Sequence, residues 1–168
     1  IDVVLISHDH YDHLDLKTLK TLIARDHPTI MAGLGIKALL DSEGIADVEE
    51  MDWWQEARQR PAGVRFTFVP ALHSSGRGLF QSNGTLWGGF VIEGSAGRVY
   101  FAGDTAYGPF LQAVHDRFPS FRLTILPIGS YEKRWFMKNQ HMNPSDAVQA
   151  HLLLESRQSV GIHYATFN

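Results

Sequence analysis

The stretch IDVVLISHDHYDHLD, residues 1–15, decides how the rest of this sequence is interpreted. Val3 to Ile6 form an apolar, mostly β-branched run, which is typical of a fully buried β-strand. Ligand-type side chains follow the run at once, as His8, His10, Asp12 and His13. In an extended segment alternate side chains share one face, and a turn at Asp12 brings His13 beside them. The stretch therefore predicts a cluster of metal-ligand side chains at the end of a strand.

The donor atoms in this cluster indicate which metals suit it. Imidazole nitrogen and carboxylate oxygen are ligands for zinc and its divalent neighbours. The sequence has nine histidines and no cysteine, so thiolate ligands and disulfides are excluded. A solvated polar loop explains one or two histidines better than it explains three with an aspartate in this order. We therefore expect a metal site built from histidine and aspartate.

Composition predicts one globular domain over residues 1–168, with 44% hydrophobic and 20% charged residues. A formal charge of -3 gives no electrostatic footprint for nucleic acid, so no such partner is expected. The sequence contains no apolar run of about 18 residues, so no transmembrane segment is predicted. Because the chain opens directly on an apolar strand, we expect it to be the C-terminal portion of a longer chain. The oligomeric state stays open, and a cytoplasmic or membrane-peripheral location is expected.

Strand and helix patterns alternate along the chain, which predicts an α/β fold. Strands are expected at residues 3–6, 29–32, 48–51, 64–69, 86–93, 98–102, 122–126 and 159–162. Helices are expected at residues 16–25, 36–42, 109–118 and 144–155. Residues 53–60 are interpreted as a turn, residues 94–97 as a hairpin turn, and residues 72–85 and 129–143 as long loops. Long loops within a compact domain are usually functional, and both of these contain histidine.

Three more ligand-type residues lie just past apolar strands, namely His73, Asp104 and His163. Taken singly, each is an ordinary loop or turn residue. Their common placement at strand ends, in a chain that already holds the first cluster, favours metal binding instead.

The stretch 126–151 holds a candidate site of a second kind, for an anionic group. Asn143 and Pro144 predict a helix start, whose backbone N–H groups attract an anion. His141 directly precedes this start, and Arg134 lies in an aromatic and basic loop before it. Both are expected near a phosphate. The alternative is a loop that packs its aromatic rings on the sheet edge, with His141 bonded to the backbone.

Together these motifs resemble the metallo-β-lactamase superfamily. The resemblance implies a four-layer αβ/βα sandwich, here lacking its N-terminal strands, with two divalent ions of the zinc type. It assigns His8, His10 and His73 to one metal, Asp12, His13 and His163 to the other, and Asp104 to the bridging position. Two such ions lower the pKa of a shared water, and the resulting hydroxide attacks phosphorus or a carbonyl carbon. Asp12 and Asp104 are then catalytic residues, and Asp12 is expected to accept the proton of the water.

Three further stretches, TLWGGFVIEG (85–94), GDTAYGPF (103–110) and LPIGSYEKRWFMKNQHMNPSDAVQAH (126–151), resemble one branch of this superfamily. That branch contains N-acyl-phosphatidylethanolamine-hydrolysing phospholipase D and its bacterial relatives. The resemblance implies a metal-dependent hydrolase acting on a small-molecule or lipid phosphodiester. It makes His141 a catalytic and phosphate-contacting residue, with Arg134 and Tyr131 in substrate binding. The alternatives are a sugar-phosphate lactonase or other ester hydrolase of the same fold, and a metal-binding fragment without turnover.

Overall fold

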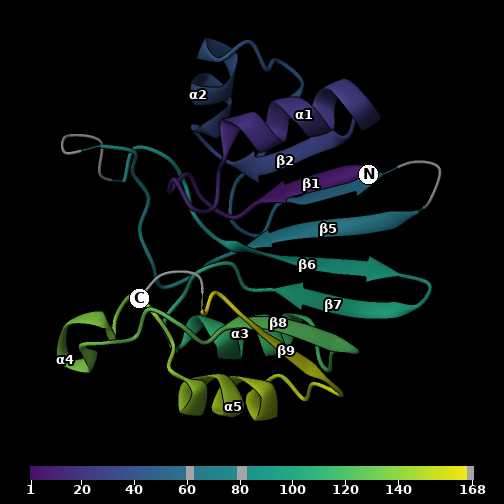
Figure 1. The fold of residues 1–168 in the computed structure, drawn as a ribbon. Coiled ribbons are helices and arrows are strands. Elements are labelled where there is room, and N and C mark those ends of the chain that lie inside the picture. The colour runs from purple at the N-terminus through teal and green to yellow at the C-terminus, as the bar shows by residue number, and fades with distance from the viewer. Residues whose placement is uncertain (60–62, 79–82, 166–168) are drawn as a thin grey trace. The chain divides into compact units, whose positions relative to one another are not determined.

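A computed structural model describes residues 1–59, 63–78 and 83–165 (Figure 1). The chain forms two compact units, each assembled from two separate stretches of sequence. The first unit contains residues 1–53 and 74–87, and the second contains residues 54–73 and 88–168. The predicted loop 72–85, of which residues 79–82 lie outside the described part, thus belongs almost wholly to the first unit.

The first unit is built on a parallel sheet. Its strands pair in the order β1 (Val3–Ile6), β2 (Thr29–Gly33), β3 (Val48–Met51). Parallel neighbours need a crossover connection, which α1 (Leu16–Asp26) and α2 (Ile36–Ser42) supply. The predicted strand β1 is confirmed, but its predicted full burial is wrong. Within the described residues β1 pairs with β2 alone, so it is an edge strand, and only Ile6 of its four residues is buried.

Helix α1 follows the metal-ligand stretch and begins at a side-chain cap. Asp15 accepts the backbone N–H of Thr18 at 2.9 Å and the Thr18 hydroxyl at 2.5 Å. At the other end His27 adopts a left-handed conformation, with φ 50°, and Pro28 prevents continuation. Leu19 is buried in the core of the unit, to which both helices and all three strands contribute. That core contains Ile6, Leu14, Leu19, Ile30, Ala32, Ile36, Leu40, Ile45 and Val48.

The second unit is built on a six-stranded mixed sheet. Its order is β4 (Glu56–Gln59), β5 (Val64–Val69), β6 (Gly89–Gly94), β7 (Gly97–Phe101), β8 (Leu123–Pro127), β9 (Ser159–Ile162). Pairs from β4 to β7 are antiparallel, and the pairs β7–β8 and β8–β9 are parallel. The predicted hairpin is confirmed, with Gly94 opposite Gly97 and a two-residue loop between them.

Helices α3 (Phe110–Arg117) and α5 (Pro144–Leu153) complete the core of the second unit. Leu111 and Val114 of α3 and Ala150 of α5 are buried in one cluster with Tyr100 and Leu126 of the sheet. These helices carry the crossovers β7–α3–β8 and β8–α5–β9, which the parallel pairing requires. Within the described residues no helix is long and apolar enough to cross a membrane.

Strand direction brings four connections to one edge of this sheet. Strand β5 runs the same way as β7, because each is antiparallel to β6, and β8 and β9 are parallel to β7. The segments that leave the carboxyl ends of these strands carry His73, Asp104, Gly129 and His163. The sheet topology alone therefore gathers the ligand-type residues of the second unit.

Two elements differ from the sequence-based expectation. Residues 53–60 were expected to be a turn, but Glu56–Gln59 form the edge strand β4, with Ala57 buried and its neighbours exposed; Arg60 lies outside the described residues. The polar composition is that of an edge strand with one buried position, which a hydrophobicity pattern misses. Within the expected loop 129–143 there is one short helix, α4 (Arg134–Met137).

Candidate metal centre

The first unit holds one cluster of ligand-type side chains, immediately after β1. The Nε2 atom of His8 lies 2.9 Å from Nδ1 of His10, and the rings of His8 and His13 have centroids 4.2 Å apart. His13 Nε2 lies 3.5 Å from the Asp12 carboxylate. His8 is buried, whereas the Asp12 side chain is 40% exposed. The structure thus brings together all four residues that the sequence predicted here.

A tight turn produces this convergence. The backbone N–H groups of His13 and Leu14 both donate to the carbonyl of His10, at 3.1 and 2.9 Å. The turn begins at Tyr11, one residue before the predicted position. Leu14 is buried in the core of the unit, so its packing holds the end of the turn.

Arg77 clamps this turn from the loop that returns to the first unit. Its Nη1 donates to the carbonyls of Asp9 and Leu14, each at 2.9 Å, and its guanidinium lies 4.2 Å from the centroid of the Tyr11 ring. The Tyr11 hydroxyl donates to the Arg77 carbonyl at 3.0 Å. The buried Asp9 carboxylate accepts the Gly76 N–H at 2.6 Å. Sequence reasoning assigned no role to Arg77, because only the fold places it on the turn.

The second unit holds another cluster, centred on Asp104. The distances from its Oδ2 are 3.2 Å to Nε2 of His163, 3.8 Å to Nε2 of His73 and 3.9 Å to Nδ1 of His141. The His141 and His163 rings stack at 5.4 Å, and the His73 ring meets His141 edge-on at 5.1 Å. His141, expected to contact substrate, therefore lies in the same cluster as three predicted metal ligands.

Backbone bonds position these side chains. Thr105, fully buried, accepts the Leu72 N–H on its hydroxyl and the Met142 N–H on its carbonyl, each at 2.9 Å. It thereby joins the loops that carry His73 and His141. In the loop after β8, a Cβ on Gly129 would overlap the carbonyl oxygen of His163. Only glycine therefore allows the backbone of His163 to lie so close to this loop. Neither contact was predicted from the sequence, although Thr105 and Gly129 lie in the quoted stretches 103–110 and 126–151.

Hydrogen bonding in the second cluster fits a bound cation. Nδ1 of His73 lies 3.0 Å from the carbonyl of Gln140, and only Nδ1 can donate in that pair. When His73 is the neutral imidazole, its Nε2 and the Asp104 carboxylate, 3.8 Å apart, are both electron-pair donors, as the ligands of a cation must be. Ligand atoms of a tetrahedral zinc site are about 3.3 Å apart. Nε2 of His163 and Nε2 of His73 lie 3.2 and 3.8 Å from Oδ2 of Asp104, which is near that spacing.

The loop before α5 places the other predicted substrate residues. Arg134 donates to the His141 carbonyl at 2.8 Å and also to the Asp146 carboxylate, so its guanidinium holds the loop in place. Tyr131 is half-buried at the start of the loop. Trp135 and Phe136 are 76% and 67% exposed, so these rings do not pack on the sheet edge as the alternative interpretation required.

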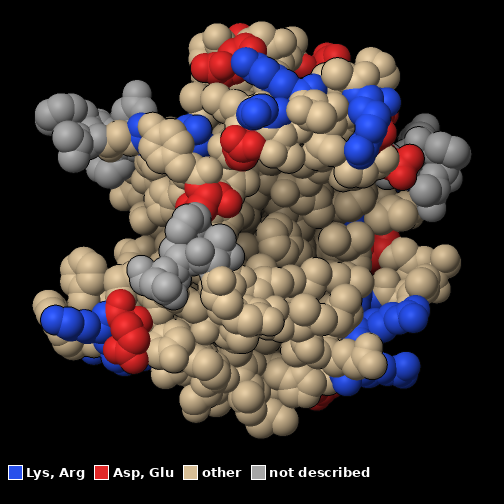
Figure 2. All heavy atoms as spheres, viewed as in Figure 1, with Lys and Arg blue, Asp and Glu red and all other residues tan. Residues whose placement is uncertain are grey.

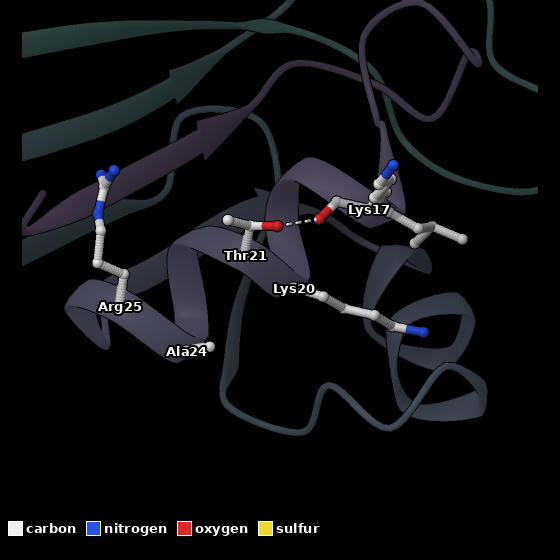
Figure 3. A pocket seen from close by; sticks show the side chains of 6 residues that line it. Lys17, Lys20, Thr21, Ala24 and Arg25 are labelled. Atoms are coloured by element: carbon white, nitrogen blue, oxygen red, sulfur yellow. Dashed lines mark hydrogen bonds between the residues drawn. The ribbon is translucent and has the colours of Figure 1, made fainter.

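A shallow hollow of about 690 Å³ along α1 lacks this chemistry (Figure 3). It is lined by Leu16, Lys17, Lys20, Thr21, Ala24 and Arg25. Lys20 pairs with Glu43 at 2.9 Å and Arg25 with Asp26 at 2.7 Å, so two of its cations already have carboxylate partners. The hollow contains none of the ligand-type residues described above.

Comparisons with known proteins show the family of this chain. The family model of the beta-lactamase superfamily domain matches residues 1–164. The chain is 39% identical to N-acyl-phosphatidylethanolamine-hydrolyzing phospholipase D 1 of Caenorhabditis elegans, covering 99% of this chain and 49% of that protein. It is 42% identical to an uncharacterized protein of Mycobacterium tuberculosis, over 99% of this chain and 45% of that one. The chain thus spans about half the length of these relatives.

Among solved structures, the chain is similar to Igni18, a metallo hydrolase from the archaeon Ignicoccus hospitalis. The TM-score is 0.77 at 25% sequence identity, covering 99% of this chain and 65% of that one. The expected α/β class and the metallo-β-lactamase fold are therefore confirmed.

Proposed function

Because the chain belongs to the metallo-β-lactamase superfamily, we propose that it works as a metal-dependent hydrolase whose substrate is a phosphodiester. The observation that carries this proposal is the Asp104 cluster, where a buried carboxylate is surrounded by three imidazoles. The name of the worm relative supports the substrate class, since N-acyl-phosphatidylethanolamine contains a phosphodiester.

We propose that the protein binds two divalent ions of the zinc type. The ligands are His8, His10, Asp12 and His13 of the first cluster and His73, Asp104 and His163 of the second. When bound, such ions lower the pKa of water and take up negative charge on oxygen. The Asp104 side chain is only 3% exposed, so water screens little of the attraction between its carboxylate and such ions.

The side chains have distinct tasks in the proposed hydrolysis. Water adds to phosphorus, one P–O ester bond breaks, and the departing alkoxide takes up a proton. Asp12, whose side chain is more exposed than that of Asp104, is proposed to accept the proton of the attacking water and release it to solvent. His141 is proposed to hold a non-bridging phosphate oxygen, on the support that it stacks on His163 and neighbours Asp104.

Arg134 and Tyr131 were expected to bind substrate, and that role stays a proposal only for Tyr131. The guanidinium of Arg134 already donates to Asp146 and to the His141 carbonyl. We therefore propose that Arg134 is a positioning residue, which acts through the backbone of His141.

Turnover of three substrate types by the zinc-loaded protein tests this function. We expect faster hydrolysis of bis(p-nitrophenyl) phosphate than of p-nitrophenyl acetate or a sugar lactone. His141→Ala should lower phosphodiester turnover roughly tenfold to a thousandfold with zinc content unchanged, on the scale of one transition-state donor. Trp135→Ala, at an exposed site six residues away, is the matched control and should leave turnover unchanged.

Two results would move the conclusion. Preferred turnover of the lactone, insensitive to His141→Ala, favours the lactonase alternative. Stoichiometric zinc with no turnover of any ester favours a metal-binding role without catalysis.

A further inference from the structure

Three arginines form a row across the amino ends of the parallel strands in the second unit. Val99 of β7 is opposite Leu123 of β8, and Thr124 of β8 is opposite Ser159 of β9. Extending this register back toward the amino ends places Arg98, Arg122 and Arg157 opposite one another. Two backbone contacts confirm the extension. Arg122 N–H donates to the Arg98 carbonyl and Arg157 N–H to the Phe121 carbonyl, each at 2.9 Å.

The three side chains share one face and one hollow. Residues opposite each other in parallel strands point to the same side of a sheet. All three line a hollow of about 410 Å³, together with Glu93, Gly94, Ala96, Gly97, Ser120 and Phe121. In Figure 2, Lys and Arg atoms gather beside the end of the β6–β7 hairpin, which Figure 1 shows at the right of the six-stranded sheet.

The hollow has more positive than negative charge. The Glu93 carboxylate accepts hydrogen bonds from Nε and Nη2 of Arg98, each at 3.0 Å, and from Nε of Arg65 at 2.8 Å. One carboxylate thus serves two arginines. The remaining donor groups of Arg98 bond the carbonyls of Pro119 and Ser120.

The other two arginines retain donors. Arg122 gives one Nη1 bond to the Ala96 carbonyl at 2.8 Å. Neither Arg122 nor Arg157 forms an ion pair with any residue in the described part of the chain. Like charges directly opposite on neighbouring strands, about 4.8 Å apart, are destabilising unless an anion lies between them.

We propose that this hollow binds a small phosphate-type oxyanion. The guanidinium fork matches the oxygens of phosphate, and Arg98 is held in place by Glu93 while Arg122 and Arg157 offer donors. The hollow is at the amino ends of β7 to β9, whereas Asp104 and His163 follow their carboxyl ends. The site is therefore separate from the Asp104 cluster, and the proposal does not rest on the proposed hydrolase activity.

Calorimetric titration of the zinc-loaded protein with sodium pyrophosphate and with inorganic phosphate tests the proposal. The double variant Arg122→Gln/Arg157→Gln should bind at least about tenfold more weakly, since charge-assisted hydrogen bonds are lost. The control Arg25→Gln/Arg117→Gln removes the same charge from exposed arginines elsewhere and should bind as the unaltered protein does. Equal weakening by both double variants, or no weakening by the first, would overturn the proposal.

Amide NMR locates the binding, because phosphate also has affinity for zinc. Pyrophosphate should shift the signals of Gly97 and Arg122 in the unaltered protein and not in the double variant. Shifts confined to Thr105 and His141 would contradict the site.

Sedimentation with phosphatidic acid vesicles identifies the source of the phosphate. If the unaltered protein sediments with the vesicles and the double variant does not, a lipid headgroup reaches the hollow. If the unaltered protein binds pyrophosphate but not the vesicles, the ligand is soluble.

Discussion

Tyr100 is wholly buried in the core of the second unit, and its hydroxyl meets no hydrogen-bond partner among the residues described. Burial raises the pKa of Tyr100. Tyr100→Phe removes an unsatisfied polar group, so we expect the free energy of unfolding to rise by about 1 kcal/mol.

The same substitution should change the alkaline limb of stability. The raised pKa means that the folded state binds the phenolic proton more tightly, so stability is full below the unfolded pKa of about 10 and falls above it. Urea unfolding at about pH 8 and about pH 11 should show that Tyr100→Phe loses less unfolding free energy between the two pH values than the unaltered protein does. Identical losses for both proteins would show that Tyr100 does not contribute.

Arg77 is the residue on which the metal-ligand turn of the first unit depends. Arg77→Ala removes two bonds to carbonyls and the contact with Tyr11, so we expect zinc affinity to fall roughly tenfold to a hundredfold. Competition with a chromogenic chelator measures it. Arg77→Lys should restore it only in part, because lysine lacks the planar fork. Unchanged affinity in Arg77→Ala would mean that Leu14 packing alone holds the turn.

Helix α5 begins at a reciprocal capping box that lies directly after the His141 loop. Asn143 accepts the Asp146 N–H at 2.8 Å, and the Asp146 carboxylate accepts the Asn143 N–H at 3.2 Å. Asn143→Ala should cost about 1 kcal/mol of stability, measured by urea unfolding. Asn143→Ser keeps a cap and should cost clearly less. An equal cost for both would place the effect in the loop rather than in the cap.

Helix α1 should make the first unit acid-sensitive. The Thr18 hydroxyl, followed by the Thr18 backbone N–H, lowers the pKa of Asp15. A carboxyl with a lowered pKa stabilises the fold above its unfolded pKa of about 3.9, and this stabilisation is lost as pH falls through the folded value. Asp15→Asn keeps the cap without the charge, so its stability should fall less between about pH 6 and pH 2. Parallel acid unfolding curves would contradict this.

At the scale of the whole molecule, metal and folding should be linked. Ions that bind only the native state stabilise it, by about 2.7 kcal/mol at a hundredfold excess over Kd. Chelation should therefore lower Tm, and Asp104→Ala should lose at least one ion by elemental analysis and respond less to the chelator. Well-folded protein that contains no zinc after incubation in zinc-replete buffer would refute the two-metal proposal.

Local features of this protein are predictable from its amino-acid sequence. Apolar runs placed β1, β5, β7 and β9, and the ligand-type residues His8, His73, Asp104 and His163 follow them, because hydrophobic periodicity and strand ends are local properties. Caps at Asp15 and Asn143 were likewise readable, since each side chain bonds a backbone group three residues away. The polar edge strand β4 and the short helix α4 were not, because neither has an apolar face of its own.

Contacts between residues that are distant in the sequence are seen only in the folded chain. The position of Arg77 on the Tyr11 turn, the joining of the His73 and His141 loops by Thr105, and the alignment of Arg98, Arg122 and Arg157 depend on pairing between stretches far apart in the chain. Strand register sets these meetings, and register is selected by burial of whole faces rather than by any short motif. His141 shows the difference clearly, since its position just before a helix start predicted a phosphate contact and the fold places it beside Asp104.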